Sequence, residues 1–263
     1  MTKIIIGRYI PGSALIYKFD ARGKLLVTFL FVFAIFLANN WPTYLVATLY
    51  TVLAIMGTGL RAHVFWDGVK PMVLLILFTS ALQLFFSTGG IVYFHWWGLW
   101  LTSTGIVNAI FIFLRFTLII LISTVMTVTT QPLAISDAME WLLTPLKWVG
   151  LPVAQLALVM SIALRFVPTL FDETLKIMNA QKARGADFNS GGLIKRSKAI
   201  APLIIPLFIS SLEIAVDLAT AMEARGYQGT SGRTRYRVLS WQKYDLINAG
   251  AFVALLILLK VLG

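Results

Sequence analysis

Five long apolar runs, none of which contains Asp or Glu, constrain the fold of this chain more than any other feature. A helix needs about 20 mostly apolar residues to cross the hydrocarbon layer of a bilayer, and somewhat fewer where the bilayer thins. The runs therefore predict a protein that crosses the membrane repeatedly. They cover residues 25–38, 43–60, 71–86, 105–129 and 246–262.

The overall composition agrees with a membrane location. Hydrophobic residues make up 59% of the 263 residues and charged residues only 13%, which is not the balance of a water-soluble protein. The formal net charge is +11, but the basic residues lie between apolar runs, so lipid headgroups and acidic protein partners fit better than nucleic acid. The chain has no cysteine, which excludes disulfides, thiolate metal sites and cysteine nucleophiles.

Two further stretches, 151–171 and 199–222, are nearly as apolar, so hydropathy alone allows seven crossings. Charge placement favours five. The basic N-terminal segment is predicted to be cytoplasmic by the positive-inside rule, and a crossing at 151–171 would place Lys182, Arg184 and Lys195 outside. Five crossings keep these bases inside, with the N-terminus in the cytoplasm and the C-terminus outside.

The predicted fold is therefore an all-α polytopic membrane protein with four regions. Residues 1–24 form a cytoplasmic N-terminal segment, 25–129 hold transmembrane helices 1–4, and 241–263 hold the fifth. Residues 130–240 form a cytoplasmic or interfacial coupling domain of about three helices, two of them long, over 153–183 and 199–224. The segments between the first and second runs, between the second and third, and over 87–101 are expected to be loops.

Both long helices are predicted to end in the pattern A-x-x-A-R-G, at Ala183-Arg184-Gly185 and at Ala224-Arg225-Gly226. For one copy, a helix C-cap with a left-handed glycine is a sufficient explanation. Two matched copies also suggest a binding role, because capping does not require Ala before Arg, and a guanidinium offers a planar fork of donors to carboxylates or backbone carbonyls of a partner. The tripeptide alone is weak evidence, since it also occurs at Ala21-Arg22-Gly23, where no long helix precedes it.

These two endings resemble the paired Ala-Arg-Gly motifs of the T component (EcfT-like) of energy-coupling factor transporters. Residues 13–26, which include Asp20-Ala21-Arg22-Gly23-Lys24, are similar to that family's opening signature, with Ala21 where Pro is usual. The resemblance covers nearly the whole chain.

The resemblance implies a non-catalytic transmembrane coupling subunit in the cell membrane of a prokaryote. Its implied partners are two ABC-type ATPase subunits, which would bind ATP and Mg²⁺, and a membrane-embedded S component that binds a vitamin or other micronutrient. No cofactor is expected in this chain itself. Arg184 and Arg225 match the family arginines that dock one ATPase each, and the implied docking residues are Ala183, Arg184, Gly185, Ala224, Arg225 and Gly226.

Two alternatives stay open. A self-sufficient permease would be expected to show an internal repeat of spans, and a membrane-embedded enzyme would need convergent carboxylates, histidines or a metal site. Arg115, near the middle of the fourth run, could mark a substrate path, but a packing role with Gln83 or with backbone carbonyls is favoured because no span offers an acid.

Overall fold

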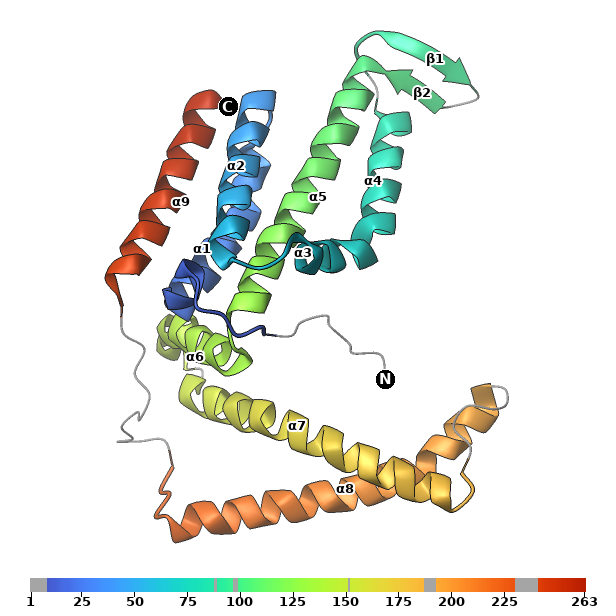
Figure 1. Ribbon diagram of the computed structural model, residues 1–263, viewed down its shortest axis with the longest axis vertical. Coiled ribbons are helices and arrows are strands. Elements are labelled where there is room, and N and C mark those ends of the chain that lie inside the picture. Colours follow the sequence, from blue (N-terminus) through green and yellow to red (C-terminus); the bar gives the residue numbers. More distant parts are fainter. Residues whose placement is uncertain (1–8, 88, 97–98, 151, 187–192, 230–240) are drawn as a thin grey trace. The chain divides into compact units, whose positions relative to one another are not determined.

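The computed structural model describes residues 9–87, 89–96, 99–150, 152–186, 193–229 and 241–263, and these residues are almost entirely helical (Figure 1). Contacts divide the chain into two compact units, Met1–Ala138 with Leu239–Gly263, and Met139–Val238. The α-helices are α1 (Ala21–Ala34), α2 (Trp41–Thr58), α3 (Ala62–Val69), α4 (Val73–Phe86), α5 (Ser103–Thr129), α6 (Pro132–Leu143), α7 (Val153–Ala183), α8 (Leu193–Ala224) and α9 (Lys243–Leu262). Short 3-10 segments are η1 (Leu15–Lys18), η2 (Ile35–Leu37), η3 (Lys70–Met72) and η4 (Thr144–Val149).

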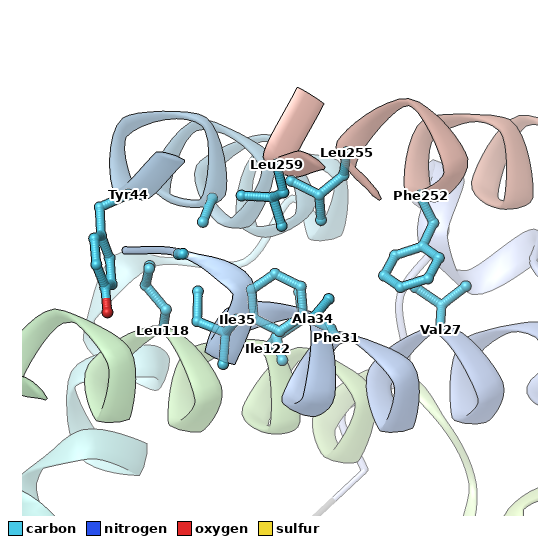
Figure 2. Close-up of a cluster of buried hydrophobic side chains, with 12 residues drawn as sticks. Val27, Phe31, Ala34, Ile35, Tyr44, Leu118, Ile122, Phe252, Leu255 and Leu259 are labelled. Atoms are coloured by element: carbon cyan, nitrogen blue, oxygen red, sulfur yellow. The ribbon is translucent and has the colours of Figure 1, made fainter. Parts of the chain in front are cut away.

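The core of the first unit lies where α1, α2, α5 and α9 pack against one another (Figure 2). Phe31 and Ile35 are completely buried, and Ile122 of α5 and Leu255 of α9 close around them. The outer surface is also apolar, and Leu74 of α4 is 80% exposed. A helix bundle that is apolar both inside and outside is stable in lipid rather than in water. The chain is thus an all-α polytopic membrane protein, as its apolar runs predict.

Within the described residues, five helical segments are long and apolar enough to cross a bilayer. They are Ala62–Phe86, Ser103–Thr129, Val153–Ala183, Pro202–Ala224 and Lys243–Leu262. The number matches the predicted five, but the set differs, because it includes α7 and most of α8 and omits the 14-residue α1 and the 18-residue α2. Length and composition therefore repeat the ambiguity of the hydropathy pattern. The assignment of α7 and α8 to the cytoplasmic side rests on charge and stays a prediction.

Two segments that the sequence suggested were loops contain regular structure. Helix α3 follows α2 and buries Phe65 and Val69, and η3 then turns the chain into α4. Between α4 and α5, strands β1 (Val92–Trp96) and β2 (Leu99–Thr102) form an antiparallel hairpin. Helical periodicity could not reveal either element, since α3 has only eight residues and the hairpin has short strands.

The N-terminal ends of α1 and α9 are joined by a buried carboxylate. Asp245, which is 2% exposed, accepts hydrogen bonds from the backbone N–H of Asp20 at 2.7 Å and of Gln242 at 2.7 Å. Lys24, which precedes the predicted first span, donates from Nζ to the carbonyl of Thr129 at the end of α5, at 3.2 Å. Burial lowers the pKa of Lys24 to about 8, against the opposing effect of Asp245 and Asp20. The lysine is therefore still a cation at neutral pH, and the carbonyl and carboxylates stabilise it.

Arg115 of α5 binds the end of the predicted first transmembrane segment. Its Nη2 donates to the carbonyl of Ala38 at 3.2 Å, and its guanidinium lies 5.0 Å from the centroid of the Phe36 ring. Ala38 follows η2, where the helical hydrogen-bond ladder stops and carbonyls lose their partners. This geometry supports the packing interpretation with a backbone carbonyl as partner.

Candidate functional site

The second unit is built on two long helices, α7 with 31 residues and α8 with 32. Each is about 45 Å long at 1.5 Å per residue. Helix α7 has the predicted bounds, whereas α8 begins at Leu193 rather than at residue 199. Prolines lie inside both helices, Pro168 in α7 and Pro202 and Pro206 in α8.

Helix α7 ends in a Schellman motif formed by the first Ala-Arg-Gly. Arg184 is the C-cap, and Gly185 has φ +90°, a left-handed conformation that suits glycine. The N–H of Gly185 donates to the carbonyl of Lys182 at 2.9 Å, and the N–H of Ala186 donates to that of Gln181 at 3.0 Å. These two bonds satisfy carbonyls in the last turn of the helix.

Helix α8 ends in the same way at the second Ala-Arg-Gly. Gly226 has φ +73°, and its N–H donates to the carbonyl of Glu223 at 2.9 Å. The N–H of Tyr227 donates to the carbonyl of Met222 at 3.0 Å. The capping interpretation of the glycines is therefore correct for both copies, and the two motifs have matching backbone geometry.

Both motifs present their arginines on open surface of the second unit. The residues that the resemblance implies for docking are all exposed: Ala183, Arg184, Gly185, Ala224, Arg225 and Gly226. A Cβ atom built on either glycine would meet no atom within 4 Å. Neither guanidinium has a hydrogen-bond or ion-pair partner among the residues that the structure describes. Both helix ends therefore project from the second unit with exposed arginine side chains and open space around the glycines.

The two helices cross near the first motif (Figure 1). The side-chain Nε2 of Gln181 in α7 lies 3.4 Å from the carbonyl oxygen of Pro202 in α8. That carbonyl has no helical donor, because the residue four positions later is Pro206, which lacks an N–H. Arg184 lies within one turn of this crossing, whereas Arg225 lies 23 residues beyond Pro202, or about 35 Å along the helix. The arrangement therefore holds the two arginines well apart.

The Gln181–Pro202 contact was not predicted from the sequence. A signal was present, since two prolines spaced four residues apart leave the first carbonyl without a helical partner. The sequence does not show which side chain supplies the donor, because that depends on how α7 and α8 cross.

Apolar side chains cover much of the exposed surface of both helices. Examples are Val159, Val167 and Phe171 in α7, and Phe208 and Val216 in α8, each at least 59% exposed. Arg165, Glu213 and Asp217 are also exposed between them. No group of three or more His, Asp or Glu that could hold a metal ion occurs among the described residues. The surface of this unit is suited to binding other molecules through apolar contact.

The fold and this site together define a class, namely all-α polytopic membrane proteins with two long helices that end in the same exposed arginine motif. The family model described as cobalt transport protein (CbiQ) matches residues 12–236. An energy-coupling factor transporter transmembrane protein EcfT from Lactobacillus helveticus is 68% identical over 261 residues, which cover 99% of this chain and 94% of that protein. EcfT proteins from Lacticaseibacillus paracasei and Bacillus subtilis are 51% and 47% identical over 262 residues, covering 99% and 98% of those proteins.

The chain belongs to the CbiQ/EcfT family, the transmembrane components of energy-coupling factor transporters. It is therefore a bacterial membrane protein and a non-catalytic transporter subunit, as the Ala-Arg-Gly pair and the N-terminal signature predicted.

Proposed function

We propose that this chain joins two cytoplasmic ABC-type ATPase subunits to a membrane-embedded S component, and that it couples ATP hydrolysis to uptake of a vitamin or other micronutrient. The observation that carries the proposal is the pair of matching helix ends at Arg184 and Arg225, both exposed and without partners among the described residues. Each arginine docks one ATPase, and the ATPases hold the nucleotide and Mg²⁺.

The geometry supports this role because a helix tip fits a groove, and a guanidinium at the tip can donate two parallel bonds to a carboxylate or to exposed carbonyls. The spacing of the arginines, about 35 Å along α8 from the crossing, suits two separate docking grooves. ATP hydrolysis can move the two long helices only if the ATPases bind the two helix ends differently in their two conformational states. The exposed apolar surface of α7 and α8 then contacts the S component.

The first test replaces each arginine by alanine. Losing a charge-assisted contact at the centre of an interface costs at least about 2 kcal/mol, so Arg184→Ala or Arg225→Ala should weaken ATPase binding by at least about 30-fold and abolish uptake. Co-purification with the ATPases and uptake of labelled substrate measure the two effects. Arg184→Lys should restore binding only in part, because an ammonium lacks the planar fork.

The matched control is Arg165→Ala, an exposed arginine on α7 that is not at a helix tip. It should leave ATPase binding unchanged. Full uptake by the Arg184→Ala/Arg225→Ala double variant would contradict the proposed docking role of these arginines. Substrate transport by the chain alone in liposomes would instead support a self-sufficient permease.

A further inference from the structure

A cavity in the first unit has no role in the proposed coupling. It has a volume of about 370 Å³, is partly open, and lies between α3, η3 and the last turns of α5. Its lining is mostly apolar and includes Val64, Met72, Ile120 and Val128. The volume far exceeds the roughly 30 Å³ that one water molecule occupies in the liquid, and an apolar lining does not hold ordered water well.

The cavity exists because α4 is much shorter than α5. Helix α4 has 14 residues, or about 21 Å, whereas α5 has 27 residues, or about 40 Å. The two helices pack along the N-terminal part of α5, where Ser80 Oγ in the middle of α4 donates to the carbonyl of Ala109 at 2.8 Å. The elements that precede α4, namely α3 and η3, run in a different direction from α4. Helix α4 therefore does not cover the last turns of α5.

Helix α3 packs closely on α5 at one edge of the cavity, beside Gly68 and Thr124. A Cβ atom on Gly68 would lie 2.7 Å from Thr124 Oγ1, so this contact requires glycine. The contact fixes α3 against α5 and keeps the space beside Thr127 and Val128 open. The cavity is therefore a product of the packing rather than of a missing side chain.

Along the membrane normal, the cavity lies at the level of the headgroup boundary of one leaflet. About 20 residues of α5 cross the hydrocarbon layer, so a span that begins near Ser103 reaches the opposite boundary near Ile122. The lining residues Ile120 to Val128 lie at that level, on the side that the positive-inside rule assigns to the cytoplasm.

Helix α3 has the character of an interfacial helix at the same level. It buries Phe65 and Val69, whereas Trp66 is 60% exposed, and tryptophan is enriched at membrane interfaces. Two exposed bases, Arg61 and Lys70, lie immediately before and after it. Bases at the surface of the cytoplasmic leaflet attract anionic lipids.

The polar part of the lining is mostly hydrogen-bond acceptors, and Ser123 adds one hydroxyl. The hydroxyls of Thr124 and Thr127 already donate to the carbonyls of Ile120 and Ser123, at 2.7 and 2.9 Å, so their oxygens can only accept a further bond. Asp67 in the lining accepts as well, and its carboxylate is 3.0 Å from Nδ1 of His63. A headgroup with hydroxyl donors is complementary to these acceptors.

We propose that this cavity binds one anionic phospholipid with a hydroxyl-bearing headgroup. An acyl chain lies against the apolar lining, the phosphate lies near Arg61 and Lys70, and the headgroup hydroxyls donate to the lining oxygens. The site does not depend on ATPase or S-component docking.

The test measures retention of dioleoyl phosphatidylglycerol by the purified full chain in detergent, using native mass spectrometry and thermal unfolding. One bound lipid per chain and a raised Tm are expected, and dioleoyl phosphatidylcholine should produce neither. Arg61→Gln and Lys70→Gln should each weaken binding about fivefold, the factor that corresponds to about 1 kcal/mol per base. Thr127→Trp should fill the cavity and abolish retention.

Controls are Lys260→Gln and Val253→Trp on α9, which carry the same changes of charge and size away from the cavity and should retain the lipid. If Thr127→Trp fails to fold, the two charge variants still decide the outcome. Equal retention of both lipids, unchanged retention in Arg61→Gln and Lys70→Gln, or equal stabilisation by soluble glycerol 1-phosphate would each overturn the proposal.

Discussion

At the scale of single residues, one tripeptide has two different structural roles in this chain. Ala183-Arg184-Gly185 and Ala224-Arg225-Gly226 end helices with left-handed glycines and exposed arginines. Ala21-Arg22-Gly23 begins α1, behind the N-cap Asp20, and Ala21 is buried against Ala134 and Ala138 of α6. The context of the tripeptide, and not its composition, therefore decides whether it begins or ends a helix.

Replacing Arg115 tests its role in packing. Arg115→Leu removes the donor to the carbonyl of Ala38, which lies in a part-buried site, so the free energy of unfolding should fall by about 1–3 kcal/mol. Arg115→Gln keeps a donor and should lose less. Thermal unfolding in detergent and substrate uptake by the assembled transporter, measured separately, check the idea. A leucine variant with normal stability but no uptake would favour a role on a substrate path instead.

At the scale of elements, the crossing of α7 and α8 includes a hydrogen bond at a defect that prolines create in α8. Pro206 removes the N–H that would bind the carbonyl of Pro202, and Gln181 of α7 supplies a donor in its place. The apolar pattern predicts both helices because helix periodicity is local. The crossing is not local, so the sequence alone did not predict it.

A double-mutant cycle tests this interaction. Gln181→Ala should destabilise the crossing by about 1 kcal/mol, because it leaves the carbonyl of Pro202 without a protein donor. Pro206→Ala restores a helical N–H, so in that background Gln181→Ala should have little effect. The coupling energy between the two sites, taken from thermal unfolding of the four variants, measures the interaction. Additive effects would mean that Gln181 does not serve this carbonyl.

At the scale of the whole molecule, the central question is which helices cross the bilayer. Helix length and hydropathy admit α7 and α8 and omit α1 and α2, whereas charge asymmetry keeps α7 and α8 on the cytoplasmic side. Both arguments arrive at five crossings, but only the second places both Arg184 and Arg225 on the cytoplasmic side, as the proposed docking of ATPases requires.

Cysteine labelling distinguishes the two arrangements, because the chain has no native cysteine to remove. Lys182→Cys, exposed beside the first motif, should react with a membrane-impermeant maleimide only after the cells are permeabilised. Ile91→Cys, at a position that is 70% exposed beside the hairpin, should react in intact cells. Labelling of Lys182→Cys in intact cells would place the first motif outside and contradict the docking proposal.

The amino-acid sequence predicted the fold class, the bounds of α7 and the positions of both arginine motifs without reference to the tertiary structure. It did so because apolar periodicity and helix caps are local properties that a short stretch of chain expresses without its neighbours. The folded chain was needed to show that Arg115 binds Ala38, that Asp245 joins α1 to α9, and that α3 turns across α5 to leave a cavity. These features depend on residues far apart in sequence, whose contact follows from how whole helices pack.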